Sequence, residues 1–144
     1  MRRLLCALLL AAGAAAAQPP PLPTVRLGAG MHLIRAEVAD RDASRARGLM
    51  HRASLAPNAG MLFVFEDSAV HCMWMKNTPL PLSVAFIDER GAIINIADMQ
   101  PHTEVSHCAA RPARFALEMA QGWFAERGIR AGTRLRGLEK LRLP

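Results

Sequence analysis

Residues 60–88 read GMLFVFEDSAVHCMWMKNTPLPLSVAFID. The two ends of this stretch, residues 60–66 and 82–88, are rich in Leu, Phe, Val and Ile and have the length of buried strands. Between them an abrupt polar triplet, Lys76-Asn77-Thr78, stands beside Pro79, where a strand has to stop. The stretch therefore predicts two core strands separated by a polar turn.

A hairpin is predicted at the end of this stretch. Residues 92–98 (AIINIAD) have the apolar character of a partner for residues 82–88. Gly91 in the connection can take the left-handed conformation that a short hairpin needs. Residues 134–138 are expected to form the last strand.

An earlier strand and a helix are predicted upstream. Residues 31–40 alternate well enough for a strand, with three expected buried positions, Met31, Leu33 and Val38. Several candidate N-cap residues follow, so a short helix is expected over residues 44–50. Pro57-Asn58 should then turn the chain back.

Residues 113–128 (ARFALEMAQGWFAERG) admit two interpretations. The spacing of Phe115, Met119 and Trp123 fits one face of a continuous helix, which the composition slightly favours. A strand followed by a helix from near Gln121 fits equally, and Gly122 would weaken a continuous helix by about 1 kcal/mol. Together the elements predict an α+β fold, a small and mostly antiparallel β-barrel-like domain with two short helices.

The N-terminus has the form of a secretory signal peptide. Met1-Arg2-Arg3 supplies positive charge, residues 4–10 form an apolar run, and small residues follow as far as Ala17. The apolar run is too short to span a bilayer comfortably, so we expect cleavage after Ala17 and a periplasmic location. Cys6 lies ahead of the alanines, which argues against lipidation.

The mature chain is predicted to be one domain. Residues 18–23 make a stiff proline-rich spacer, and residues 24–144 form a single globular domain with no further transmembrane segment. Loss of Arg2 and Arg3 would lower the formal net charge from +6 to +4. The remaining charges are scattered, which together with export argues against nucleic acid as a partner.

Several motifs occur together in the order and spacing of a known family. They are Arg47-Gly48-Leu49-Met50, Gly60-Met61-Leu62-Phe63 with Phe65, Trp74-Met75-Lys76-Asn77-Thr78, Pro81-Leu82, and Leu117-Glu118 followed by Gly122. Over about residues 31–138 the chain resembles the domain of unknown function 192 family, also called uncharacterised protein family 0127, in its exported proteobacterial type.

The resemblance implies a small β-rich domain and no particular activity. It also implies that the segment around Leu117-Glu118 is a strand and that the helix follows Gly122. One position departs from the family pattern, because many members carry Asp where this chain has Ser83. A role for that carboxylate in catalysis or metal binding is therefore in doubt here.

The two cysteines of the mature chain allow three interpretations. In an oxidising compartment Cys72 and Cys108 favour one disulfide, closing a loop of about 36 residues. As the alternative, soft sulfur beside imidazole suits copper or zinc, with a candidate ligand set of His71, Cys72, His102, His107 and Cys108. Two free thiols are the third interpretation. If Cys72 and Cys108 form a disulfide, no cofactor is expected.

The polar triplet is the candidate ligand site. Lys76 would supply charge, Asn77 and Thr78 orientation, and Trp74 an apolar wall, with Glu118 and Arg47 as neighbours. Glu118 is a natural ion-pair partner for Lys76. The competing interpretation is structural, with Asn77 and Thr78 satisfying backbone groups in the turn and Lys76 simply solvated.

Three functions from different classes are compatible with these residues. The preferred one is a non-enzymatic periplasmic binding or accessory domain for a small polar ligand or a protein partner. Metal handling through the histidine and cysteine cluster is the first alternative. A hydrolase or transferase of unknown substrate, using Glu118, Lys76 and a histidine for acid–base catalysis, is the second alternative. The chain contains no phosphate-binding loop, nucleophile elbow or metalloprotease motif.

Overall fold

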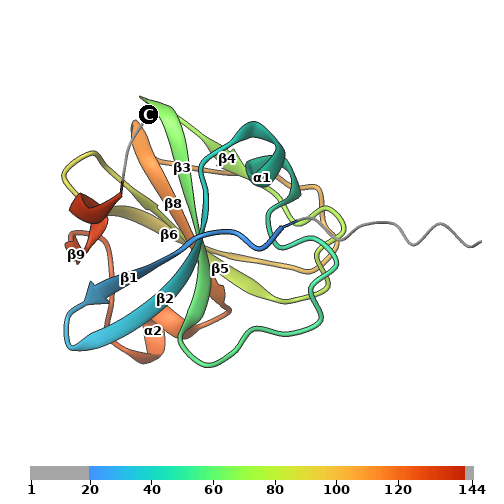
Figure 1. Ribbon diagram of the computed structural model, residues 1–144, viewed down its shortest axis with the longest axis horizontal. Coiled ribbons are helices and arrows are strands. Elements are labelled where there is room, and N and C mark those ends of the chain that lie inside the picture. The colour runs from blue at the N-terminus through green and yellow to red at the C-terminus, as the bar shows by residue number, and fades with distance from the viewer. Residues whose placement is uncertain (1–19, 142–144) are drawn as a thin grey trace, which may run out of the picture.

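One seven-stranded sheet organises residues 20–141, the part of the chain that the computed structural model describes (Figure 1). In spatial order its strands are β6 (Ile93–Met99), β5 (Leu82–Ile87), β8 (Ala113–Ala120), β3 (Ala59–Ala69), β2 (His32–Ala39), β1 (Thr24–Ala29) and β9 (Leu135–Arg136). A separate two-stranded sheet pairs β4 (Cys72–Met73) with β7 (His107–Cys108). The helical elements are α1 (Asp42–Arg47), α2 (Trp123–Glu126) and the 3-10 turn η1 (Leu138–Lys140).

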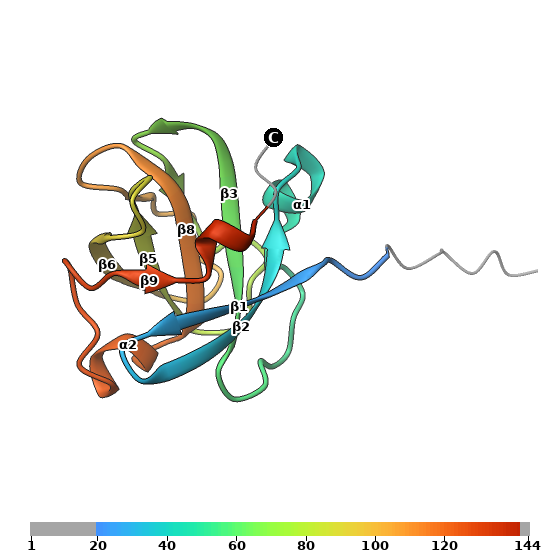
Figure 2. The ribbon, with the colours of Figure 1, turned by 60° about the vertical axis from the view of Figure 1, so that its left-hand side comes forward.

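The large sheet curls until its two edges approach each other. Its neighbouring strands are antiparallel except β2 and β3, which run parallel. Between the edges, the N–H of Ile93 donates to the carbonyl of Thr133 at 2.9 Å, and the N–H of Leu135 donates to the carbonyl of Gly91 at 2.8 Å. Figures 1 and 2 show the resulting wrapped sheet. The predicted α+β, mostly antiparallel and barrel-like fold with two short helices is confirmed.

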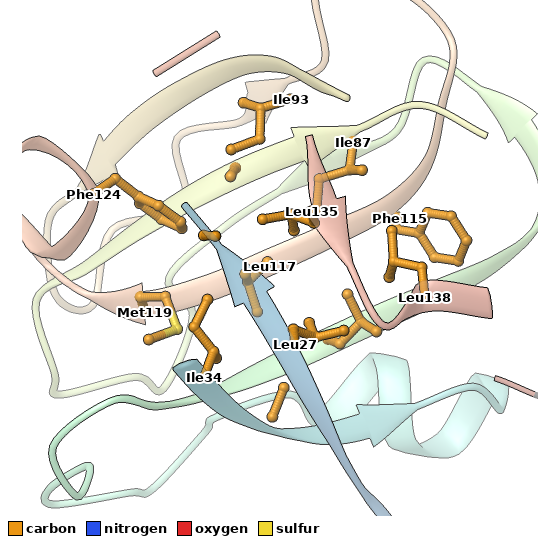
Figure 3. Packing of buried hydrophobic residues seen from close by; sticks show 14 of the residues in the cluster. Leu27, Ile34, Ile87, Ile93, Phe115, Leu117, Met119, Phe124, Leu135 and Leu138 are labelled. Atoms are coloured by element: carbon orange, nitrogen blue, oxygen red, sulfur yellow. The ribbon is translucent and has the colours of Figure 1, made fainter. Parts of the chain in front are cut away.

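The inner face of the curled sheet encloses the main apolar core. Figure 3 shows side chains from opposite parts of the sheet meeting there, with Leu27 and Ile34 on one side and Leu117 on the other. Phe124 from α2 and Leu138 from η1 close the ends of this core. Burial of apolar surface, at about 25 cal/mol per Å², is what holds the two halves of the sheet together.

The outer face of the same sheet is covered over only part of its width. Over β3, β5 and β8 it carries a second apolar cluster, to which the connecting loops contribute Leu49, Met75 and Ala109. Over β1 and β2 this face carries Arg26 and Arg35, and both are exposed. Part of the outer face is therefore accessible beside a loop-covered part.

The prediction of buried positions in the first strand is wrong at two of its three residues. Met31 is 89% exposed and Leu33 is 71% exposed, whereas Val38 is buried. Met31 lies in the turn between β1 and β2, and Leu33 lies on the uncovered outer face. Alternation identifies which residues share a face, but only the packed structure decides which face is covered.

Most of the remaining elements agree with the predictions to within a few residues, but β1, β7 and η1 were not predicted. Residues 113–128 form the strand β8 followed by α2, as the family resemblance implied, and Gly122 lies between them with a left-handed φ of 82°. The predicted helix over residues 44–50 begins and ends earlier, as α1. The strand β1 was not predicted, although Val25, Leu27 and Ala29 alternate along it; its pairing with β2 is seen only in the tertiary structure.

The predicted signal peptide, residues 1–17, lies outside the described residues. Within the described part, folded structure begins with β1 at Thr24, as expected after a proline-rich spacer. No helix among residues 20–141 has the length and apolar character needed to cross a membrane.

Candidate functional site

The polar triplet forms a turn that uses much of its own hydrogen-bonding capacity. Thr78 is only 4% exposed, and its hydroxyl donates to the carbonyl of Lys76 at 3.0 Å. Asn77 has a left-handed φ of 51°, and its carbonyl accepts the N–H of His51 at 2.8 Å. The bond from His51 ties the turn to the loop after α1, and the side chain of Asn77 is exposed.

Lys76 pairs with Glu104. The predicted ion pair between Lys76 and Glu118 is therefore wrong. The Lys76 Nζ lies 3.7 Å from a carboxylate oxygen of Glu104, and both side chains are largely exposed. The same ammonium lies 5.2 Å from the ring centroid of Trp74, which is 46% exposed. Lys76 and Trp74 thus form a solvent-facing cation–π pair.

Glu118 is buried in the middle of β8. It lies between Val84 of β5 and Met61 of β3, on the outer face beneath the loops, and is 3% exposed. No hydrogen bond or ion pair recorded for residues 20–141 involves its carboxyl group. Burial raises the pKa of Glu118 to about 8, so the folded protein holds this side chain mainly in its neutral form at pH 7.

Ser83 stands where many family members carry Asp, and it is buried. Its hydroxyl donates to a carboxylate oxygen of Asp98 at 2.5 Å and accepts the N–H of Gly122 at 2.9 Å. A serine here links β5, β6 and the start of α2. The carboxylate at this place is supplied from the neighbouring strand, by Asp98.

Cys72 and Cys108 form the predicted disulfide. Their sulfur atoms are 2.04 Å apart, and the two residues are direct partners across β4 and β7. Both cysteines are exposed. The disulfide closes a loop of 36 residues and joins the two connections that cover the second apolar cluster.

The structure does not gather the predicted metal ligands. The disulfide uses both thiols, and the ring of His71 is stacked on Phe65 at a centroid distance of 3.7 Å. His102 lies in a turn with a φ of 60°. Across the described residues, no three His, Cys, Asp or Glu side chains are placed to hold one ion, so His71, Cys72, His102, His107 and Cys108 do not form a centre.

A cleft of about 980 Å³ lies at the boundary between the covered and uncovered parts of the outer face. Its walls come from residues 20–24, from β2, from α1 with its flanking turns, and from the loop that leads into β3. We call this space the α1 cleft. Of the residues predicted to bind ligand, only Arg47 lines it.

One ion pair is fixed in the wall of the α1 cleft. The two terminal nitrogens of Arg52 donate to the two carboxylate oxygens of Glu37 at 2.8 and 2.7 Å. These hydrogen bonds raise the pKa of Arg52, against the desolvation of its partial burial. A bidentate pair of this kind satisfies both charges and fixes the loop to β2.

Three other arginines line the α1 cleft without such a partner. No hydrogen bond or ion pair recorded among residues 20–141 involves the guanidinium of Arg35, Arg41 or Arg47. Asp40 contributes a carboxylate to the same lining, and no ion pair is recorded for it within the described chain. The charges of Arg52 and Glu37 cancel. The three arginines and Asp40 then leave the cleft lining with a net positive charge.

A smaller hollow of about 460 Å³ lies beside the disulfide. Trp74 and His71 line it together with acidic side chains, and Arg45 is already engaged there with Asp42 at 2.5 Å. Lys76, Asn77, Thr78 and Glu118 line neither this hollow nor the α1 cleft. The predicted ligand site is thus dispersed over a turn, a hollow, a cleft and the buried sheet.

Sequence reasoning missed Arg35, Arg41 and the pair of Arg52 with Glu37. A signal was present in β2, where Arg35 and Glu37 alternate with Ile34, Ala36 and Val38 and so mark a charged outer face. Nothing local indicates that residues 40–60 fold back beside that face to make a cleft.

Comparisons with known proteins agree with this fold. The model of the family DUF192, described as Uncharacterized ACR, matches residues 24–137. A crystal structure from Novosphingobium aromaticivorans, of a protein of unknown function, is 32% identical with a TM-score of 0.77, covering 91% of this chain and 99% of that one. A second crystal structure, from Sinorhizobium meliloti, is of a protein named as a proposed transcription regulator. It is 35% identical with a TM-score of 0.78, covering 83% of this chain and 98% of that one. No curated protein matches the chain significantly.

Proposed function

The chain belongs to the DUF192 family of uncharacterised proteins, and we propose that it is an exported, non-enzymatic domain that binds a small polar ligand in the α1 cleft. The observation that carries the proposal is the cleft itself. Its volume of about 980 Å³ falls in the range of small-molecule sites, and charged side chains without internal partners line it.

The chemistry of the lining supports binding over catalysis. The titratable side chains among the described lining residues are arginines and carboxylates, without a histidine, cysteine or lysine. Histidine, the commonest general acid or base, and the cysteine and lysine nucleophiles are therefore missing from this described lining. Arginine instead remains charged at all accessible pH values and is suited to holding a ligand.

Export to the periplasm is part of the proposal and rests on the N-terminal sequence. A charged start, an apolar run and an alanine-rich end match a cleavable signal. The Cys72–Cys108 disulfide is in keeping with an oxidising compartment. The regulatory role named for the Sinorhizobium protein is not included, because export would separate this domain from DNA.

The experiment is to recover the protein from the periplasmic fraction and to measure bound small molecules by native mass spectrometry. Ala56→Trp would place an indole in the α1 cleft and should abolish the bound mass. Ala125→Trp, on the exposed surface of α2, is the matched control and should retain it. Equal occupancy in both variants would place the ligand elsewhere and overturn the proposal.

The same preparation tests export. The intact mass should correspond to a chain that begins at Gln18, with no free thiol. A full-length mass in the cytoplasmic fraction alone would contradict the proposed location.

A further inference from the structure

We infer that the ligand of the α1 cleft is a multivalent anion, bearing phosphate or carboxylate groups, that is held by Arg35, Arg41 and Arg47. This inference rests on the proposed function and names the class of ligand. Its basis is the arrangement of arginines on the uncovered outer face of the sheet, which continues into the cleft.

Two arginines stand opposite each other on neighbouring strands of the uncovered face. Arg26 of β1 and Arg35 of β2 are direct register partners in an antiparallel pair, so their side chains project from the same face. Side chains placed opposite each other in this way have Cβ atoms about 5 Å apart. The two arginine side chains therefore branch from opposed positions on one face, and like charges at opposed positions disfavour the fold.

No free carboxylate on the outer face of β1 and β2 offsets the positive charge of Arg26 and Arg35. The other outer-face positions of these strands are Thr24, Gly28, Leu33, Glu37 and Ala39, and the only carboxylate among them belongs to Glu37. Glu37 is fully engaged with Arg52. Within the described chain, neither Arg26 nor Arg35 has a recorded partner for its guanidinium.

Arg136 extends the positive face from β1 to β9. Arg136 of β9 is the register partner of Gly28, and its guanidinium lies so close that a Cβ on Gly28 would meet it at 2.8 Å. Arg136 donates to the carbonyl of Gly30 at 2.7 Å, which holds the group in place without neutralising its charge. The outer face over β9, β1 and β2 thus carries a row of positive charge that leads to Arg35 at the cleft.

The cleft then adds Arg41 and Arg47 from the two ends of α1. Several guanidinium groups around one concave space can make a planar, multidentate match for carboxylate or phosphate oxygens. Apolar surface from Leu22 and Leu55 lies in the same lining and would contact the body of the ligand. The positive row outside the cleft would raise the association rate of an anion.

The test uses pyrophosphate and citrate as probes for the two sources of negative charge. Each is titrated into ligand-free protein recovered from expressing cells, with sodium chloride at matched ionic strength, and both the dissociation constant and the thermal midpoint are followed. We expect one or both anions to bind and to raise the midpoint. Arg35→Gln and Arg47→Gln should each weaken binding by about tenfold or more.

The matched control is Arg130→Gln. Arg130 is exposed, lines neither cavity, and has no recorded partner for its guanidinium within residues 20–141. This variant loses the same charge and should bind the anions as the unmodified protein does. The ratio of the pyrophosphate to the citrate dissociation constant assigns the ligand to the phosphate or the carboxylate class.

A second readout separates binding from a structural role. Because Arg26 and Arg35 repel each other, Arg35→Gln should raise the thermal midpoint of the ligand-free protein while it weakens the anion response. A lower midpoint with an unchanged anion response would overturn the inference, as would anions that act no better than sodium chloride. A neutral or cationic molecule displaced by Ala56→Trp would overturn the anion inference while leaving the proposed function intact.

Discussion

The hydroxyl of Ser83 donates to a carboxylate oxygen of Asp98 at 2.5 Å, between residues that are direct register partners on β5 and β6. The same hydroxyl oxygen accepts the N–H of Gly122 at 2.9 Å. One buried side chain therefore joins two strands to the turn that begins α2. The position at which many relatives carry Asp serves here as a structural junction.

Ser83→Ala should destabilise the protein by about 1 to 3 kcal/mol, because it leaves the Gly122 N–H without its acceptor in a partly buried place. Urea denaturation measures the change. An Ala variant as stable as the original protein would mean that water replaces the hydroxyl at no cost.

Ser83→Asp, which restores the residue common in the family, should also destabilise the protein, because it sets two carboxylates opposite each other across β5 and β6. Adding Asp98→Ser to that variant should recover most of the loss, since the donor and acceptor have then exchanged strands. The double-mutant cycle measures this coupling, and simple additivity of the two changes would refute it.

Glu118→Gln should remove a pH dependence of stability. The unfolded side chain titrates at its ordinary value of 4.5, and burial raises the pKa in the folded protein to about 8. Between these values the unfolded state releases the proton while the folded state keeps it. The contribution of Glu118 to the free energy of unfolding therefore falls by about 1.4 kcal/mol for each pH unit, and it is constant below and above this window.

Denaturation curves for the original protein and for Glu118→Gln should therefore diverge as the pH rises, with the Gln variant gaining relative stability. Other groups titrate in both proteins, so only the difference between the two profiles reports on Glu118. Glu89→Gln, at an exposed position, is the control and should show no such divergence. Parallel profiles for Glu118→Gln would mean that its carboxyl group is solvated in the folded state.

Reduction of the disulfide should lower stability by about 4 kcal/mol on the chain-entropy model, for the loop of 36 residues between Cys72 and Cys108. Because both cysteines are exposed, a reductant should reach the bond in the folded protein. The measurement is the urea midpoint with and without a phosphine reductant. Replacing both cysteines with Ala should reproduce the reduced midpoint and remove the response to reductant.

Asn77→Ala should cost about 1 kcal/mol, because the left-handed φ of 51° is unfavourable for a residue with a Cβ and no local polar group. Asn77→Gly should be close to neutral, because glycine adopts this conformation freely. The two denaturation midpoints distinguish a conformational role from a side-chain role. Loss of a bound ligand in both variants, with the Gly variant fully stable, would restore the amide of Asn77 to the binding site.

Much of the fold follows from local patterns in the chain. The apolar runs of residues 60–66 and 82–88 became β3 and β5, and Gly91 took the left-handed φ of 84° expected of a hairpin glycine. These signals are short-range, because strand alternation and turn stereochemistry are properties of neighbouring residues. Cys72 and Cys108 were likewise expected to favour one disulfide, and this disulfide is confirmed.

The candidate site was far less accessible to such reasoning. Lys76, Asn77 and Thr78 drew attention as a polar group between apolar runs, yet Thr78 is buried and Lys76 pairs with Glu104 across a loop. The sequence around Glu118 does not indicate that neighbouring strands and covering loops bury its carboxyl group without a hydrogen-bond or ion-pair partner among the described residues. Contacts of this kind join residues far apart in the chain, so composition and spacing do not specify them.

The sequence by itself indicated most of the strands and turns, the family, and the disulfide as the preferred state of the cysteines, because each depends on local stereochemistry or on very few alternatives. Only the tertiary structure decided which face of β1 and β2 stays open, and this is why Leu33, Arg26 and Arg35 are exposed. It also decided that residues 40–60 fold beside that face to form the α1 cleft. The physical reason is that a strand presents two faces with equal alternation, and long-range packing of loops selects the one to be covered.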